Sequence, residues 1–453
     1  MKLLLIAGVM LWLPVVALAQ EAQQRKLFPY KYTIDDLPNG LRLITVPTPY
    51  PNLVALYIVV SVGSRNEVEP GKSGYAHFFE HMMFRGSQNY TPAQRDAILK
   101  RAGASSNAYT SDDRTVYHEV FSKDDLDAVM RLEADRFQRL KYDEGAFRTE
   151  ALAVLGEYNK NSASPFSQLY EKLRETAFTR HTYSHTTMGY LKDIQDMPNQ
   201  YEYSLQFYNR FYRPEYTTVV LVGDVTREQA LDLTKKYFGD WKRGDYVPQI
   251  PAEPAQDGPR TAHIDWPSPT LPYLAVAFHG PAYSDEKKDK AALDLLAIIA
   301  FGENSDLYQR LVLKEQKVDR LAPAFEDQMD PELFTVFARV KDRKDMDYVR
   351  DQVLETFKRY TTELVPQEKL NATRSRVRYG FALSMDSSEA IARALAPYVA
   401  LRRTPETIDK LFALYETITP EDIRATAAKY FTEQNRTIVT LATGGKTARE
   451  GKK

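Results

Sequence analysis

The stretch GYAHFFEHMMFRG at residues 74–86 constrains the fold of this chain more than any other. His77 and His81 are four positions apart with Glu80 between them, so on a helix both imidazoles project from one face beside the carboxylate. This H-x-x-E-H order is the inverse of the H-E-x-x-H zinc motif. Two neutral imidazoles at this spacing suit a tetrahedral zinc ion, and a catalytic site needs a third protein ligand and an open position for water. Glu80 is then the general base that deprotonates that water.

The alternative is that His77 and His81 are ordinary buried histidines on an apolar helix, so the decisive question is whether a third ligand exists. A helix expected from about residue 146 carries Glu150 and Glu157. These residues are seven apart, two turns along one stripe, or about 10.5 Å along the helix axis. Acidic residues on a helix are often only a solvated face, and spacing by itself leaves that interpretation open.

Composition limits the class of protein and the type of ligand. A chain of 453 residues is long enough for two or three domains. Its net charge of -1 gives no reason to expect binding to nucleic acid or to a membrane surface. The chain has no cysteine, so it has neither disulfides nor thiolate ligands, and a metal would be held by imidazole and carboxylate groups.

Residues 1–19 are typical of a secretory signal peptide. Lys2 precedes an apolar run that ends in Ala-Leu-Ala at 17–19, a small-x-small cleavage signal before Gln20. An uncleaved membrane anchor is the alternative, but Pro14 and the Ala-x-Ala ending favour removal. We therefore expect export across the inner membrane with no stable anchor after cleavage, and in a Gram-negative bacterium the expected compartment is the periplasm.

The rest of the chain divides at a proline-rich segment. Prolines at 248, 251, 254 and 259, with glycines at 244 and 258, are typical of an extended linker. The predicted units are an N-terminal leader (20–35), a zinc-binding domain (36–241), the linker (242–262), a similar C-terminal domain without a metal site (263–445) and a polar tail (446–453).

The segments after the linker repeat the order of those before it. A strand at 274–279 and a helix at 291–301 parallel the strand at 53–62 and the motif helix. If Phe301 corresponds to Phe84, the places of His77, Glu80 and His81 are taken by Asp294, Ala297 and Ile298. Similarity this low can arise by chance, but it indicates two similar α+β domains of which only the first can bind metal.

Together these motifs make the chain resemble the pitrilysin, insulin-degrading enzyme and mitochondrial processing peptidase family of zinc metallopeptidases. The resemblance covers nearly all of the mature chain and rests on LPNGL at 37–41, the motif at 74–86, SNAYT at 106–110, YRP at 212–214 and VGD at 222–224. It implies an α+β fold of two homologous domains, each a mainly antiparallel sheet with helices packed on one side, arranged as a clam shell. It also implies one zinc ion per chain and hydrolysis of peptide bonds.

The resemblance assigns roles to further residues. The family's third zinc ligand is a glutamate about 76 residues beyond the second histidine, which is Glu157 here, and Glu150 matches the family's second acid. Because Glu150 is too far along the helix to reach the same ion, we expect it to orient a ligand. Asn107, Ala108 and Tyr109 would form the edge strand to which an extended substrate peptide adds, although an ordinary edge strand is the alternative.

One departure from the family pattern concerns the C-terminal half. Relatives that work as a single chain have an arginine there and, seven residues later, a tyrosine that bind the substrate, whereas Val312 and Asp319 stand at those places here. The sequence therefore predicts a zinc metalloendopeptidase for extended or unfolded polypeptides, completed by a homologous partner subunit that carries the Arg/Tyr pair. The alternatives are a chain that works alone or as a homodimer, and a non-catalytic zinc-binding assembly subunit.

Overall fold

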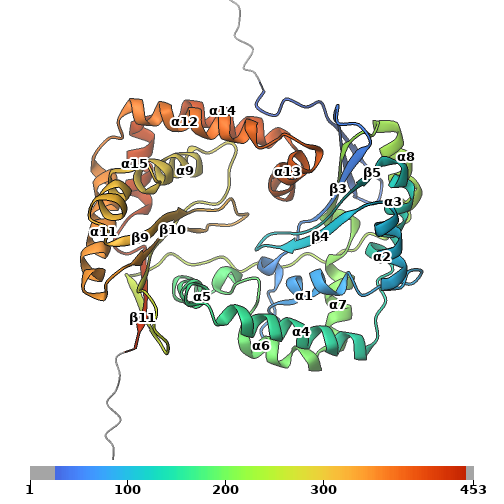
Figure 1. Cartoon of the computed structure of the whole chain (residues 1–453), viewed down its shortest axis with the longest axis horizontal. Coiled ribbons are helices and arrows are strands. Elements are labelled where there is room, and N and C mark those ends of the chain that lie inside the picture. The colour runs from blue at the N-terminus through green and yellow to red at the C-terminus, as the bar shows by residue number, and fades with distance from the viewer. Residues whose placement is uncertain (1–25, 445–453) are drawn as a thin grey trace, which may run out of the picture.

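The computed structural model describes residues 26–444 and contains two sheets, one in each half of the chain (Figure 1). The N-terminal sheet has the order β1-β2-β6-β3-β5-β4 and the C-terminal sheet the order β7-β11-β8-β10-β9. Neighbouring strands are antiparallel except for the pairs β2–β6 and β7–β11. The strands are β1 (Thr33–Asp36), β2 (Arg42–Pro47), β3 (Leu53–Val60), β4 (Ser105–Thr110), β5 (Thr115–Ser122), β6 (Thr217–Gly223), β7 (Arg260–Trp266), β8 (Tyr273–His279), β9 (Val318–Ala324), β10 (Leu333–Val340) and β11 (Arg436–Thr443).

The strand orders confirm the internal repeat. The order β2-β6-β3-β5-β4 in the first half corresponds position by position to β7-β11-β8-β10-β9 in the second, including the single parallel pair. The strand β1 is the addition in the first half. The predicted α+β fold of two similar domains is therefore confirmed, and Figure 1 shows them facing each other as two halves of a shell.

Helices follow the same order relative to the strands in each half, except that the helix after the last strand of the first half has no counterpart within residues 26–444. The helices of the first half are α1 (Tyr75–Met82), α2 (Pro92–Arg101), α3 (Leu126–Gln138), α4 (Glu144–Ser162), α5 (Pro165–Ala177), α6 (Leu191–Asp196), α7 (Tyr201–Phe211) and α8 (Arg227–Phe238). Those of the second are α9 (Lys288–Phe301), α10 (Asp306–Tyr308), α11 (Met346–Thr362), α12 (Gln367–Leu383), α13 (Ser388–Arg402), α14 (Glu406–Thr417) and α15 (Pro420–Tyr430). Single turns are η1 (Ser64–Asn66), η2 (Lys123–Asp125), η3 (Thr182–Ser184), η4 (Met197–Asn199), η5 (Pro214–Tyr216), the π-helical η6 (Gln309–Lys314) and η7 (Arg343–Asp345). Within residues 26–444 no helix has the length and apolarity needed to cross a bilayer.

Each sheet is covered on its second face by a helix from the opposite half. Helix α13 lies against β3 and β6, and α5 lies against β7, β8 and β11. Leu169 and Leu173 of α5 belong to the same apolar cluster as Val439 and Leu441 of β11. This exchange explains why β3 is apolar on both faces, because a strand between two helical layers has no solvated side. The family resemblance predicted helices on one side only, and the structure adds the exchanged helix on the other.

Polar contacts also fasten the two halves together. Arg403, just after α13, has a left-handed backbone with φ of 55°. Its guanidinium donates to the carbonyl oxygens of Gly40 (2.9 Å), Glu215 (3.0 Å) and Thr217 (2.9 Å). One arginine of the C-terminal half therefore satisfies three backbone acceptors of the N-terminal half.

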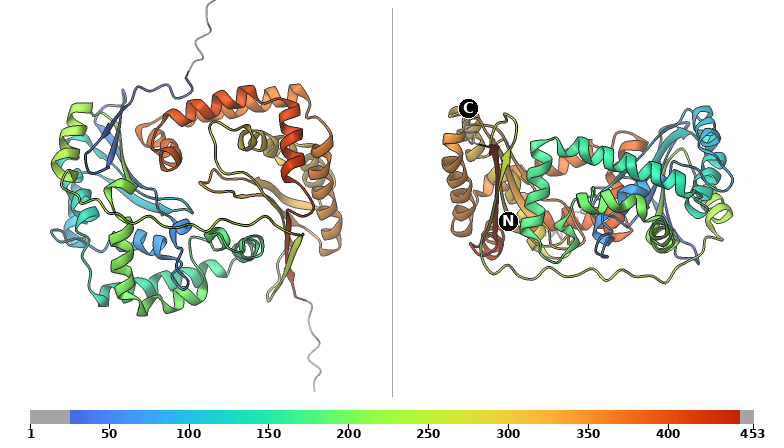
Figure 2. Two further views of the ribbon diagram at one scale, coloured as in Figure 1. Left: turned by 180° about the vertical axis from the view of Figure 1, so that it is seen from behind. Right: turned by 90° about the horizontal axis from the view of Figure 1, so that it is seen from below.

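The ends of the predicted units can be compared with the structure only in part. The predicted signal peptide, the whole polar tail and residues 20–25 of the leader lie outside the described residues. The strand β7 begins at Arg260, three residues inside the predicted linker, because pairing with β11 starts there. The extended linker crosses between the halves (Figure 2) and is held by Glu253, whose carboxylate accepts hydrogen bonds from the backbone N–H groups of residues 179–181.

Candidate metal and catalytic site

Helix α1 presents the motif because its start and its inner face are both fixed by burial. Gly74 precedes the helix with φ of 89°, a conformation that favours glycine. The buried carboxylate of Glu67 accepts hydrogen bonds from the backbone N–H groups of Gly74 and Ala76, both at 2.7 Å, and so satisfies two donors of the first turn. Phe78 and Phe79 are fully buried against the N-terminal core, which leaves the opposite face of the helix to the motif residues.

The two histidines of the motif meet Glu157 from helix α4. Glu157 Oε2 lies 3.6 Å from His77 Nε2 and 3.4 Å from His81 Nε2. Ligand atoms about 2.0–2.2 Å from a tetrahedral zinc ion are separated by roughly 3.4 Å from one another, so these distances fit such an ion. Within residues 26–444 this is the only group of three or more His, Cys, Asp or Glu residues close enough to hold a metal.

The protonation state of His77 and the hydrogen bond of His81 both suit a metal ligand. A metal ligand must be a neutral imidazole, and burial together with the neighbouring His81 lowers the pKa of His77 to about 4. His81 Nδ1 lies 2.9 Å from Glu150 Oε1, and an Nδ1–H donated to that carboxylate leaves Nε2 free to face Glu157. Glu150 therefore lies where it can orient His81.

Glu150 is itself held in the ionised form. Burial alone would raise its pKa, but hydrogen bonds from His81 and from the Arg85 guanidinium hold the pKa of this carboxyl below its ordinary value. The Glu150 carboxylate also raises the pKa of His81. A carboxylate–imidazole pair of this kind orients the ring and raises the basicity of the ligand nitrogen.

Glu80 lies on the same face of α1 and receives a single hydrogen bond within the described residues. Thr110 at the end of β4 donates its hydroxyl to Glu80 Oε2 at 2.6 Å. Burial raises the pKa of Glu80, although this hydrogen bond opposes the shift. A partly desolvated carboxylate is a stronger base than one in water, which suits a group that accepts a proton from water.

The predicted substrate strand is an edge strand. In the sheet β4 pairs with β5 alone, through Asn107 with His118, Ala108 with Tyr117 and Tyr109 with Val116. Among residues 26–444 no strand pairs with its other edge, so the backbone of an extended peptide can add there. Because Thr110 follows directly and contacts Glu80, the free edge leads to the histidine and glutamate cluster.

Thr110 and Glu67 were not recognised from the sequence as parts of the site. Thr110 lies within SNAYT, and the alternation of side chains along a strand places it on one face with Ser106 and Ala108. That signal was available, but which face of β4 lies against α1 depends on how the sheet packs. The other five histidines contact groups outside the cluster: His118 stacks on Tyr57, His181 bonds Asp330, His185 bonds Thr186, His263 bonds Thr440 and His279 bonds Ala177.

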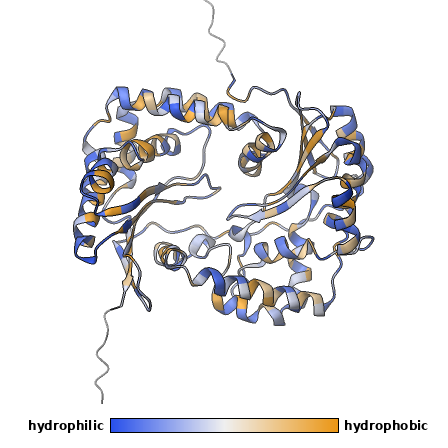
Figure 3. Ribbon diagram, viewed as in Figure 1, coloured by the Kyte–Doolittle hydropathy of each residue, from blue (hydrophilic) through white to orange (hydrophobic). Residues whose placement is uncertain are grey.

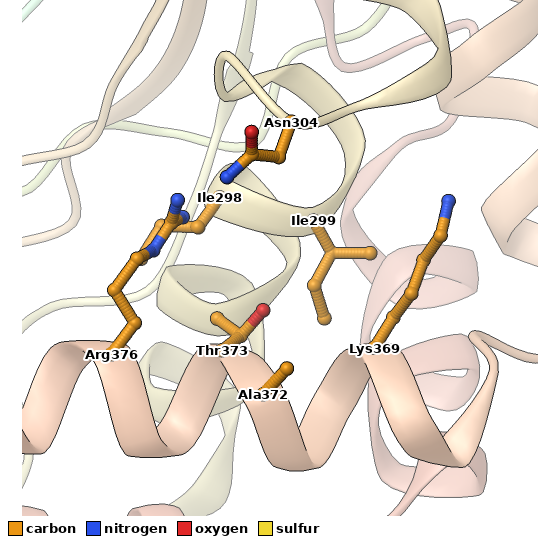
Figure 4. Close-up of a pocket in the computed structure, with 7 residues that line it drawn as sticks. All are labelled: Ile298, Ile299, Asn304, Lys369, Ala372, Thr373 and Arg376. Atoms are coloured by element: carbon orange, nitrogen blue, oxygen red, sulfur yellow. The ribbon is translucent and has the colours of Figure 1, made fainter.

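The C-terminal counterpart of the cluster has different chemistry. At the place of His77, Asp294 pairs with the buried Lys290 at 2.5 Å, and at the place of His81 stands Ile298. Counting from the N-caps of α4 and α12, Thr373 and Gly380 take the places of Glu150 and Glu157. A pocket of about 310 Å³ lies between α9 and α12, and its polar lining is Asn304, Lys369, Thr373 and Arg376, with no carboxylate (Figure 4).

The C-terminal half also lacks the Arg/Tyr pair at the expected places. Val312 is partly buried against the C-terminal core, and Asp319 is ion-paired with Arg339, with Oδ2 2.7 Å from Nη2. Both side chains are therefore engaged within their own half.

Hydropathy along the ribbon shows the same contrast between an apolar core and polar outer faces in both halves (Figure 3).

Comparison with known proteins gives matches over most of the chain. The family model described as Insulinase (Peptidase family M16) matches residues 42–190, and the one described as Peptidase M16 inactive domain matches residues 200–377. A protein of Helicobacter pylori named zinc protease PqqE is 29% identical over 412 residues, which are 89% of this chain and 91% of the relative. A protein of Schizosaccharomyces pombe named probable mitochondrial-processing peptidase subunit beta is 25% identical over 388 residues, 82% of this chain and 83% of the relative. The crystal structure of a protease from Helicobacter pylori superimposes with a TM-score of 0.85 at 28% identity, covering 91% of this chain and 99% of that one.

Proposed function

Because the chain belongs to peptidase family M16, as the motifs in its sequence indicated, we propose that it is a zinc-dependent endopeptidase. In this proposal His77, His81 and Glu157 hold one zinc ion. Bound zinc supplies a Lewis acid that polarises the scissile carbonyl and lowers the pKa of water to about 7. The convergence of two imidazoles and one carboxylate within 4.8 Å of one another is the observation that carries the proposal.

The residues of the chain perform the remaining steps. Glu80 accepts the proton of the attacking water and then passes it to the nitrogen of the leaving amine. Thr110 holds one oxygen of the Glu80 carboxylate. Glu150 holds the Nδ1 side of His81 and so directs the other ring nitrogen at the metal.

The substrate is proposed to be an extended or unfolded polypeptide. Asn107, Ala108 and Tyr109 offer the free edge of β4, which can pair only with a backbone that is not already in secondary structure. Strand addition aligns the substrate backbone beside the cluster and places few demands on its side chains. Folded proteins would then be resistant unless they expose a slack segment.

We further propose that a homologous subunit with the Arg/Tyr pair completes the site in a heterodimer. The support is the absence of that pair at 312 and 319, the match of residues 200–377 to an inactive domain, and the naming of one relative as a subunit beta. A homodimer is the alternative assembly. The signal-like residues 1–19 support a periplasmic location in this proposal.

The test uses Glu80→Gln, which removes the base but no proposed metal ligand. The purified parental chain is expected to contain one zinc ion and, together with a candidate partner subunit, to hydrolyse a quenched extended peptide. A chelator should abolish this activity, and added zinc should restore it. The variant should retain zinc yet lose at least 100-fold in kcat, since a positioned base contributes about 10²–10⁴-fold. Hydrolysis at the parental rate by the zinc-loaded variant contradicts the assignment, and zinc without any hydrolysis in the parental assembly favours a non-catalytic subunit.

A further inference from the structure

The tips of two corresponding hairpins meet across the halves of the molecule. The β4–β5 turn at residues 111–114 contacts the β9–β10 loop at residues 325–332. Asp113 Oδ2 accepts a hydrogen bond from the backbone N–H of Met329 at 2.6 Å, and Asp112 Oδ2 accepts one from Gln328 Nε2 at 3.2 Å. We call these two tips and their contacts the hairpin clasp.

Ion pairs with each half of the molecule also hold the clasp. Asp330 Oδ2 accepts a hydrogen bond from Arg65 Nε at 2.5 Å and lies 2.9 Å from His181 Nε2. Arg65 and His181 both belong to the N-terminal half. In the C-terminal half, the buried Lys290 pairs with Asp327 of the same loop at 2.7 Å. The loop is thus fixed to its own half by one ion pair and to the other half by several charged contacts.

Burial makes the clasp a rigid joint. The side chains of Asp112, Asp113 and Gln328 are all buried. Separating the tips would leave the two carboxylates and the amide without these partners in a poorly solvated place, which is costly for buried polar groups. The relative position of the two tips is therefore well defined.

Strand β4 connects the clasp to the general base. The turn of the clasp starts at Ser111, directly after Thr110, and Thr110 donates the hydrogen bond to Glu80. In the described part of the chain β4 pairs with a neighbour on one side only, so no second strand there holds its outer edge. The clasp supplies a fixed point at the end of β4 that lies nearest Glu80.

We propose that Thr110 is a positioning residue for Glu80 and that the C-terminal half, through the hairpin clasp, holds Thr110 in place. This inference rests on the proposed function of Glu80 as the base. It gives the C-terminal half, which has no metal cluster among the described residues, a part in positioning the catalytic base. The half acts on the base through β4 and makes no contact with the reacting atoms in this role.

The role of Thr110 is tested with Thr110→Val, which keeps the shape but removes the donor, and with Thr110→Ser, which keeps the donor. The zinc-loaded full chain is assayed with its partner subunit if the parental activity requires one. Thr110→Val should lower kcat about tenfold, as expected for loss of one hydrogen bond to a charged group, with KM and zinc content within about twofold of the parent. Thr110→Ser should restore kcat to within about threefold of the parent. A parental kcat in Thr110→Val, or a Thr110→Ser variant as slow as Thr110→Val, overturns the role.

The clasp is tested without an activity assay, by measuring hydrogen–deuterium exchange in the metal-free chain. Asp330→Ala removes the acceptor for Arg65 and His181, and Asp330→Asn serves if the first variant does not fold. The peptide covering residues 105–110 should exchange at least threefold faster than in the parent. The matched control is Ser388→Ala, which removes a different contact between the halves, to Thr48 at 3.1 Å, and should leave that peptide unchanged.

The two readouts separate the possible failures. If β4 exchanges at the parental rate in the folded Asp330 variants, the clasp does not hold the strand and the inference fails. If the exchange changes as expected but the parental assembly hydrolyses no peptide, the proposed function fails while the structural joint remains. A faster β4 together with a lower kcat and full zinc content in Asp330→Ala supports the whole inference.

Discussion

Replacing Glu150 with Gln should weaken zinc binding although Glu150 is not a proposed ligand. The carboxylate is 3% exposed, lies 2.9 Å from His81 Nδ1 and also binds Arg85. The amide of glutamine has no charge to stabilise the imidazole, and it can present its NH₂ group to the ring nitrogen, which disfavours the Nδ1–H form. His81 Nε2 would then lose both basicity and orientation.

The size of the effect follows from the type of contact. A hydrogen bond to a charged group contributes about 1.5–3 kcal/mol, and loss of such partners of metal ligands typically costs 10–100-fold in metal affinity. The low exposure of Glu150 places the expected loss within this range, since solvent screens the pair little. We therefore expect the Kd for zinc to rise about 10–100-fold.

The assay is a competition titration of zinc against a chromophoric chelator at fixed pH. The matched control is Glu144→Gln on the same helix, whose carboxylate pairs with Arg148 at 2.9 Å on the exposed face. This control should change the Kd less than twofold, because exposed ion pairs are worth at most about 1 kcal/mol and this one is remote from the cluster. A Glu150→Gln chain that binds zinc as tightly as the control refutes the argument that Glu150 orients His81.

Further predictions concern stability and metal dependence. Arg403→Ala should lower the free energy of unfolding by about 2–4 kcal/mol in urea, because three backbone acceptors between the halves lose their donor, whereas an unchanged midpoint would contradict this. Asp330 should contribute acid-dependent stability. Burial alone would raise its pKa, but His181 and Arg65 lower it to about 2 from 3.8, so the contribution is present above pH 4 and lost as pH falls toward 2. Asp330→Asn removes this titrating group. Between pH 4 and pH 2 the free energy of unfolding of the variant should therefore fall by on the order of 2 kcal/mol less than that of the parent, as measured by urea unfolding at each pH. Stoichiometric zinc should raise the unfolding temperature of the parental chain but not that of a His77→Ala variant, and equal shifts would argue against the cluster as the metal site.

Local chemistry in the sequence predicted the motif helix, the strand around residues 107–109 and the repeated halves. The spacing of His77, Glu80 and His81 places them on one face of any α-helix, because the helical period is the same in every protein. The repeat was recognisable because segments predicted as strands and helices occur in the same order before and after the linker. The equivalence of β2-β6-β3-β5-β4 with β7-β11-β8-β10-β9 confirms that reading.

The partnership with Glu157 required information beyond local pattern. Spacing alone left Glu150 and Glu157 as two acids on one stripe, and only the family resemblance distinguished a ligand from an orienting group. The structure brings Glu157 to both Nε2 atoms and Glu150 to His81 Nδ1. A distance across 76 residues of sequence depends on how α4 packs against α1, which no local period encodes.

What the sequence determined by itself was the set of chemical groups and their order along each helix and strand, since these follow from backbone geometry over a few residues. Tertiary structure alone decided that α5 and α13 cover the opposite sheets, that Thr110 faces Glu80, and that the hairpin tips meet. The physical reason is that an apolar helix face or a polar strand face specifies only that it needs a partner. Which partner it finds is settled by the packing of the whole chain.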